Sequence, residues 1–190
     1  MKRKKVEKCS YGYINWKKKE QILATLYLAI VAGVIFIGGY LWNGNSEKNI
    51  FTVFAILLLL PAARHLVEVI ILFPYRTPTA DLYEQVKQTA KTDAILFSDY
   101  VFTSQEKVMF LSSLVVQGNE IIGLTGRKQE KTDYIKEYLM RSMKQRNLPC
   151  QVAIYTEREA YLKRIARGIT EPLAEDVLKE VVDFLRASAV

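Results

Sequence analysis

Residues 22–42 form an uninterrupted apolar run of 21 residues that contains no charged side chain. A helix rises about 1.5 Å per residue, so a helix of this length spans about 30 Å, the thickness of the hydrocarbon core of a bilayer. A cleavable signal peptide has a shorter apolar region and a cleavage site between small residues, whereas this run ends in Tyr40, Leu41 and Trp42. We therefore expect an uncleaved membrane-spanning helix, in preference to the buried helix of a soluble core.

A second apolar stretch, residues 50–73, follows a short polar link at residues 43–49. A link of this length joins antiparallel neighbours, because a parallel neighbour would need a longer crossover. The sequence therefore predicts a two-helix transmembrane hairpin over residues 21–73, with a stiff, proline-containing linker at residues 74–78. Pro61 lies within the second stretch and is expected to kink its helix.

The net charge of +7 is concentrated in residues 1–20, which carry +6, while residues 21–73 carry zero and residues 74–190 carry +1. A nucleic-acid-binding domain would spread its basic residues over the folded part of the chain, so no nucleic acid is expected as a partner. The positive-inside rule instead places the N-terminus in the cytoplasm, the link outside, and the C-terminus back in the cytoplasm. The basic arm, residues 1–20, is expected to contact anionic lipid head groups of the cell membrane.

Three polar residues of the second stretch are candidates for an intramembrane ion pair. Arg64 and Glu68 are four residues apart and His65 and Glu68 are three apart, so they share one helix face. We expect a neutralised pair near the inner interface, where the Arg64 side chain can snorkel to the head groups. A proton relay or transport role, and a contact with a partner helix, are the alternatives.

Small residues recur every four positions along the first stretch, at Thr25, Ala29 and Gly33. Such a stripe allows close approach of another helix. We expect the second helix of the same chain as the partner, with self-association of two chains as the alternative.

Residues 79–190 are predicted to fold as a cytoplasmic α+β domain with a mixed sheet and the element order α-β-β-β-α-β-α-α. Gly118-Asn119 is a two-residue hairpin signal between two of the strands. The expected helices are residues 79–91, 132–146, 157–167 and 171–187, and the expected strands are residues 94–103, 108–117, 120–124 and 150–155.

No catalytic constellation is evident in this domain. The chain has two cysteines, Cys9 and Cys150, and a single histidine, so neither a metal site, a cofactor site nor a serine triad is expected. Arg127 and Lys128 follow a strand and precede a helix, which makes them weak candidates for anion binding. The scattered acids, including Asp99, are expected to lie on the surface.

The element order is similar to that of restriction-endonuclease-like domains over roughly Leu82–Tyr155. That resemblance would imply a magnesium site built from one acid and an acid-x-Lys motif on the next strand. Asp99 is available, but the following strands read VMFLSSLVVQ and EIIGL and carry no such motif. The resemblance therefore extends only to topology, which does not convey function.

The layout as a whole resembles small uncharacterised two-pass membrane proteins of Gram-positive bacteria. The resemblance is carried by the aromatic and basic segment YGYINWKKKEQ, the second span LLLLPAARHLVEVI and the exit PYRT. It implies the fold and the location in the cell membrane, and it brings no activity or catalytic residue.

From these patterns we expect a membrane-tethered, non-catalytic cytoplasmic domain that binds another protein or itself. One alternative is a divergent membrane-tethered nuclease or hydrolase, with a polar cleft around Asp99. A second alternative is an accessory subunit of a transporter or envelope complex, in which Arg64, His65 and Glu68 contact partner helices.

Overall fold

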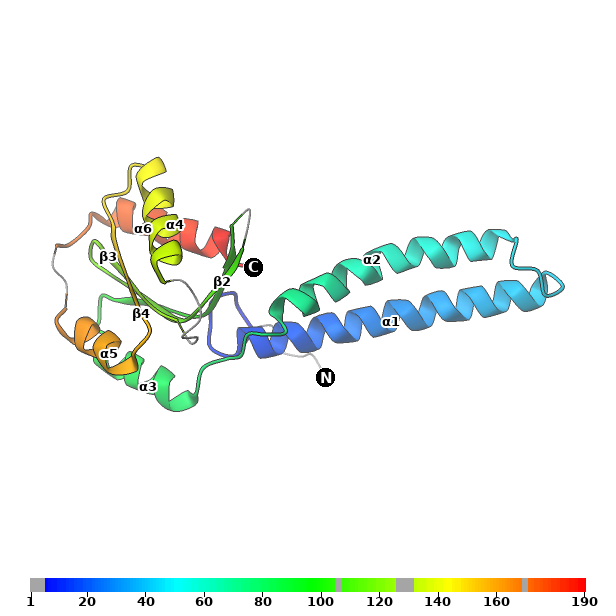
Figure 1. The fold of residues 1–190 in the computed structure, drawn as a ribbon, viewed down its shortest axis with the longest axis horizontal. Coiled ribbons are helices and arrows are strands. Elements are labelled where there is room, and N and C mark those ends of the chain that lie inside the picture. Colours follow the sequence, from blue (N-terminus) through cyan, green and yellow to red (C-terminus); the bar gives the residue numbers. More distant parts are fainter. Residues whose placement is uncertain (1–5, 105–106, 126–131, 169–170) are drawn as a thin grey trace. The chain divides into compact units, whose positions relative to one another are not determined.

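The computed structural model describes residues 6–104, 107–125, 132–168 and 171–190. It contains two long apolar helices followed by a small α+β domain with a mixed four-stranded sheet, as the sequence predicts (Figure 1). The chain divides into two compact units. One is Ile14–Arg76, and the other combines the N-terminal residues up to Tyr13 with Thr77–Val190.

The first unit is a helical hairpin. Its helices are α1, Tyr13–Trp42, and α2, Ile50–Leu72. Asn49 begins α2, because its side chain accepts a hydrogen bond from the backbone N–H of Thr52 at 2.9 Å. The helix α1 starts nine residues before the apolar run, so the basic stretch Lys17–Lys19 is helical rather than part of a separate arm.

The second unit contains the remaining elements, which agree with the predicted ones to within a few residues. Its helices are α3, Ala80–Thr89; α4, Thr132–Gln145; α5, Arg158–Ala166; and α6, Glu175–Ser188. Its strands are β1, Ile95–Thr103; β2, Val108–Gln117; β3, Glu120–Leu124; and β4, Gln151–Tyr155.

The sheet has the strand order β1-β2-β3-β4. The first three strands form an antiparallel meander, and Gly118 makes the tight turn between β2 and β3 with a φ of 57°. The strand β4 pairs parallel to β3, since α4 carries the chain back across the sheet before β4 begins. The mixed sheet follows from this single crossover.

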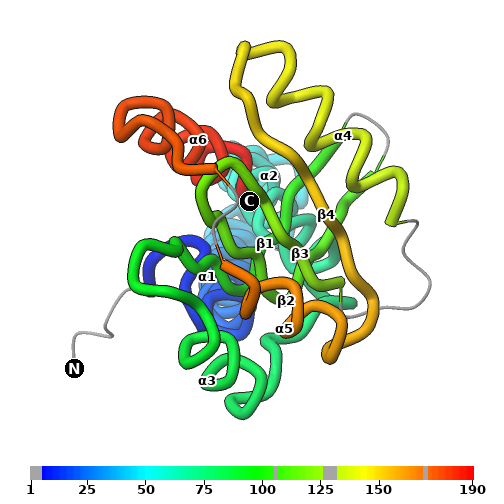
Figure 2. The backbone as a smooth tube through the Cα atoms, turned by 90° about the vertical axis from the view of Figure 1, so that its left-hand side faces the viewer, coloured from blue at the N-terminus to red at the C-terminus, as the bar shows by residue number. Residues whose placement is uncertain are grey.

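Helices cover both faces of the sheet (Figure 2). One face packs on α4 and α6 through a cluster that includes Leu111, Leu139 and Leu185. The opposite face packs on α3 and α5 through a smaller cluster that includes Val86 and Tyr161. Burial on both faces explains why β2 is a nearly continuous apolar run.

The alternation of side chains along β1 and β2 shifts at Asp99, which has a φ of 54° and drops out of the strand pairing. Phe97 and Tyr100 lie in the same core cluster although they are three residues apart, and so do Leu111 and Leu114 on the neighbouring strand. A regular strand places residues two apart on one face. At Asp99, with its left-handed conformation, the side-chain alternation of β1 therefore shifts by one residue, and the alternation of the paired strand β2 shifts at the same level.

Both ends of the chain cover the outer edge of β1. The Ser98 N–H donates to the Cys9 carbonyl at 2.8 Å, and the Val190 N–H donates to the Val101 carbonyl at 2.9 Å. Tyr11 also packs against Tyr83 of α3, with the ring centres 4.7 Å apart. The N-terminal residues 6–12 thus belong to the α+β domain, and not to a separate arm on the lipid surface as predicted from the sequence.

Candidate functional site

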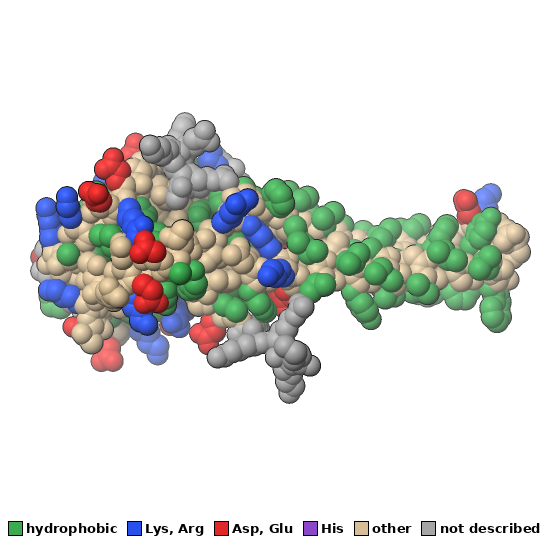
Figure 3. All heavy atoms as spheres, turned by 90° about the horizontal axis from the view of Figure 1, so that it is seen from below, with side chains coloured by type: hydrophobic (Ala, Val, Ile, Leu, Met, Phe, Trp, Pro, Cys, Tyr) green, Lys and Arg blue, Asp and Glu red, His purple; other side chains and the backbone are tan. Residues whose placement is uncertain are grey.

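Apolar side chains on both helices of the hairpin point outward. In the most apolar stretch of each helix, only 11% of the residues are buried. Figure 3 shows hydrophobic side chains over the visible face of the hairpin. The core helix of a soluble protein buries most of such a stretch, so this hairpin offers its apolar surface to another apolar phase. Both helices are long and apolar enough to cross a bilayer.

The two helices meet along a different seam from the predicted one. After its first two residues, Tyr13 and Ile14, the buried positions of α1 are Gln21, Ala32 and Gly39, whereas Ala29 is exposed. A Cβ added at Gly39 would lie 2.8 Å from Phe51 Cγ and closer still to its Cβ, so Gly39 is the position at which the helices approach closely. A Cβ at Gly33 would meet nothing within 4 Å. The prediction that α2 packs on the stripe of Thr25, Ala29 and Gly33 is therefore wrong.

The reason is the geometry of the helix. Successive positions four residues apart rotate by about 400°, so a strict spacing of four drifts about 40° per step around the helix. A seam between two antiparallel helices needs a mean spacing close to 3.5 residues. Gln21, Leu28, Ala32 and Gly39 follow that spacing, and Leu28 is half-buried.

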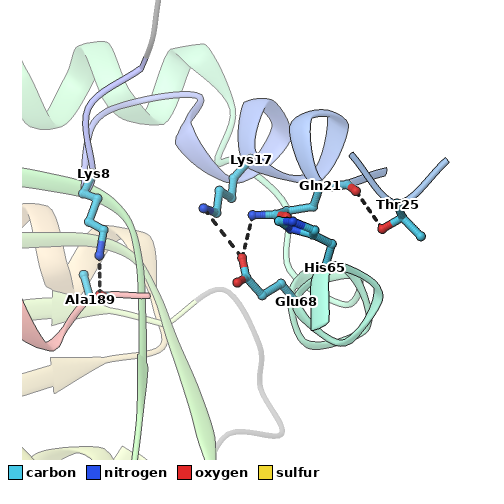
Figure 4. A network of polar contacts seen from close by, with 7 residues as sticks. All are labelled: Lys8, Lys17, Gln21, Thr25, His65, Glu68 and Ala189. Atoms are coloured by element: carbon cyan, nitrogen blue, oxygen red, sulfur yellow. Dashed lines mark hydrogen bonds and ion pairs between the residues drawn. The ribbon is translucent and has the colours of Figure 1, made fainter. Parts of the chain in front are cut away.

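A polar cluster joins the two helices near the end of the hairpin that carries both connections to the domain (Figure 4). Gln21 is only 5% exposed and donates from Nε2 to Glu68 Oε2 at 2.6 Å. The Nδ1 of His65 donates to the Oε1 of the same amide. Lys17 Nζ lies 3.6 Å from Glu68 Oε2. One side-chain amide therefore bridges the imidazole and the carboxylate.

Of the three residues predicted to form an intramembrane ion pair, the structure brings two into this cluster and leaves the third outside it. Glu68 and His65 both belong to the cluster, but Arg64 is exposed and, within the described part of the chain, forms no ion pair with Glu68. Lys17 of α1 is the cation that pairs with Glu68 instead. Spacing within one helix reveals only partners on that helix, whereas the hairpin brings a cation to Glu68 from 51 positions away along the chain.

Lys18 closes the same end of the hairpin. Its Nζ donates to the carbonyl of Phe73 at 3.2 Å and to the carbonyl of Tyr75. These carbonyls follow the last turn of α2, where backbone acceptors have no intrahelical partner. At this end of the apolar hairpin lie two lysines, a carboxylate and backbone carbonyls that accept hydrogen bonds from a lysine. Such a mixture of charged and polar groups suits the boundary between hydrocarbon and head groups of a bilayer.

Asp99 is buried, not on the surface as predicted from the sequence. Its side chain is 2% exposed, and the hydroxyl of Thr77 donates to its Oδ2 at 2.9 Å. The carboxylate holds the residues that enter the domain against β1. Among the described residues, no group of three or more His, Cys, Asp or Glu side chains could hold a metal ion.

An open groove of about 870 Å³ runs beside α4 and the start of β4. Tyr134, Tyr138 and Met140 supply its apolar wall, and Arg141 and Lys144 contribute positive charge. Cys150 also lines the groove, where partial burial raises the pKa of its thiol. Sequence patterns did not single out this surface, although its residues belong to α4 and to the loop that directly follows it.

Arg127 and Lys128, the predicted weak anion-binding candidates, lie outside the described residues. Gln21 and Lys17 were missed as site residues. The available signal was their spacing of four at the border between the basic segment and the apolar run.

No protein-family model matches the chain, and no curated protein and no solved structure matches it either.

Proposed function

We propose that the chain is a two-pass membrane protein of the cell membrane, with both termini in the cytoplasm, and that its α+β domain is a non-catalytic module that binds another protein. The outward-facing apolar surface of the hairpin carries the membrane part of this proposal. The lysines at one end of the hairpin, against Lys48 alone in the link, support the orientation.

The groove beside α4 supports the binding part. The strand β4 is the last strand of the sheet, and in the described part of the chain only β3 pairs with it. A free strand edge accepts an extended segment of another chain through main-chain hydrogen bonds. Met140 is 44% exposed, and the lining carries Arg141 and Lys144 against the single acid Glu137. These side chains favour a segment with apolar and acidic side chains.

Membrane integration is tested by alkaline carbonate extraction of membranes that contain the full chain. Val34 is exposed midway along α1, so Val34→Arg places a charge in the hydrocarbon core at a cost of about 2.5–3.5 kcal/mol and lowers the integrated fraction. Asn43→Arg adds the same charge in the polar link and leaves integration unchanged. Release of the unaltered chain by carbonate would contradict the proposal.

Binding at the groove is tested by the alkylation rate of Cys150 in the full chain. A partner segment seated in the groove covers this thiol, so Cys150 reacts more slowly in native membranes than in purified protein. Addition of detergent sufficient to dissociate complexes restores the faster rate. Equal rates in both preparations would show an uncovered groove and contradict the interaction.

A further inference from the structure

A small cavity of about 180 Å³ lies where the N-terminal residues pack on the α+β domain. Its walls come from four separate parts of this domain, namely the N-terminal residues, α3, β1 and α6. The residues that matter for its chemistry are Lys8, Cys9, Ser98 and Arg186. A water molecule takes up about 30 Å³ of liquid volume, so the cavity has room for a polyatomic ion.

The hydroxyl of Ser98 points to a bound group. Ser98 is 2% exposed, and its Oγ has no hydrogen-bond partner among the described residues. Its backbone N–H is already bonded to the Cys9 carbonyl, which fixes the residue at the cavity wall. A buried hydroxyl without a partner is costly, and native proteins rarely keep one unless a ligand or water completes it.

Two cations face the same space. The ammonium group of Lys8 has three N–H donors, and one of them donates to the Ala189 carbonyl, with Nζ and O 3.2 Å apart (Figure 4). The other two can donate to a bound group. Arg186 is exposed and forms no hydrogen bond or ion pair with any residue that the structure describes. Glu7 is the only acid among the lining residues, so the wall carries a net positive charge.

The electrostatic effect of both cations reaches the cavity wall. Burial raises the pKa of the Cys9 thiol to about 11, the charges of Lys8 and Arg186 act in the opposite direction, and the weaker influence of the Asp99 charge raises the pKa further. Each of the two cations acts on Cys9 more strongly than Asp99 does, so the three charges together give a positive potential at this wall, and a positive potential favours an anion.

We propose that this cavity binds a phosphate group, with donors from Ser98 Oγ, Lys8 Nζ and the Arg186 guanidinium. Three donors from three elements suit a tetrahedral oxyanion, which offers several acceptor oxygens in different directions. The group is either free phosphate or the phosphate of a lipid head group. This site is separate from the groove beside α4 and goes beyond the proposed function.

The test titrates inorganic phosphate into the purified full chain in a non-ionic detergent, at constant ionic strength, with calorimetry and thermal unfolding as readouts. Phosphate binds saturably and raises the unfolding temperature, because a ligand of the folded state stabilises it. Arg186→Gln weakens binding by about tenfold, the effect of one charge-assisted hydrogen bond. Lys179→Gln, an equal charge change on the exposed part of the same helix, leaves binding unchanged.

Ser98→Ala separates a ligand role from a structural one. The substitution removes a hydroxyl that has no protein partner, so without phosphate the variant is as stable as the unaltered chain or more stable. Its phosphate affinity nevertheless falls several-fold. A loss of stability without phosphate, or an unchanged affinity, would contradict the proposal.

Lipid nanodiscs distinguish the two sources of phosphate. If the head group is the ligand, anionic phospholipid in the disc competes with inorganic phosphate. If free phosphate is the ligand, its affinity is the same in discs of neutral and of anionic lipid. The absence of saturable binding of inorganic phosphate, or equal weakening by Lys179→Gln and Arg186→Gln, would overturn the proposal.

Discussion

The side-chain amide of Gln21 on α1 donates to the carboxylate of Glu68 on α2, with Nε2 and Oε2 2.6 Å apart. The same amide accepts from His65, so one glutamine satisfies two polar side chains of the facing helix. In a membrane, a polar side chain without a partner is expensive, and this bridge removes that cost for both residues. It also fixes how the two helices are aligned along their length.

This bridge predicts an energetic coupling between Gln21 and Glu68. In a double-mutant cycle with alanine at both positions, we expect about 0.5–1.5 kcal/mol of coupling in the unfolding free energy, as for other hydrogen bonds between membrane helices. The matched cycle of Arg64→Ala and Glu68→Ala gives no coupling, because Arg64 is exposed and forms no ion pair with Glu68 in the described part of the chain. Denaturant titration of the chain in detergent measures both. Stronger coupling in the second cycle would restore the pair predicted from the sequence.

Gly39 and Gly33 provide a matched test of the helix seam. Gly39→Ala forces a methyl group against Phe51 and lowers stability by about 1–3 kcal/mol through overpacking. Gly33→Ala adds its methyl group to open space and raises helix propensity, so stability is unchanged or slightly higher. Thermal unfolding in detergent compares the two variants. The reverse order of stabilities would place Gly33 at the contact between the helices.

Asp99 tests whether a buried carboxylate in a left-handed conformation supports the fold. Asp99→Asn keeps an acceptor for Thr77 and a side chain that tolerates positive φ, so we expect only a small loss of stability. Asp99→Val loses both and costs several-fold more in the unfolding free energy. Denaturation of the full chain measures the two losses. Equal losses would show that backbone conformation and the Thr77 contact do not matter at this position.

The two thiols should respond differently to pH. Burial raises the pKa of Cys9 from 9.0 to about 11, so little reactive thiolate forms at Cys9 in the folded chain at pH 8. Cys150 is less buried and is alkylated first. Because the folded state holds the Cys9 proton more tightly, ionisation of Cys9 destabilises the fold as the pH rises from 9 towards 11.

Mass spectrometry after alkylation identifies the modified cysteine, and unfolding at each pH measures the stability. Cys9→Ala should remove the part of the pH dependence that belongs to this thiol. Equal alkylation of Cys9 and Cys150 in the folded chain would mean that the N-terminal residues do not stay packed on β1.

The sequence was informative wherever one local pattern decides the structure. Apolar length indicates the second hairpin helix, and the Gly118-Asn119 turn indicates the β2–β3 hairpin, so these elements were predicted almost to the residue. Apolar length also gave the end of α1 but not its start, which lies in the basic segment. The domain strands read as strands because branched and aromatic residues fill both buried faces.

The positions that were mispredicted depend on contacts between distant parts of the chain. Lys17 replaces Arg64 beside Glu68 because the partner comes from the other helix, which spacing within α2 does not reveal. Asp99 is buried because Cys9 and Thr77 both contact β1, and no local pattern around Asp99 signals these contacts. The cavity likewise exists only after the fold is formed, because its walls come from four distant parts of the chain.

The most direct test of the membrane hairpin is its topology in living cells. A single cysteine placed at Ser46 in the link, and a second variant with a cysteine after Val190, are exposed to a membrane-impermeant thiol reagent in a Cys9→Ala, Cys150→Ala background. The account predicts labelling of the link in intact cells and labelling of the C-terminus only after the membrane is opened. Labelling of the C-terminus in intact cells, or of neither position until the membrane is opened, would contradict it.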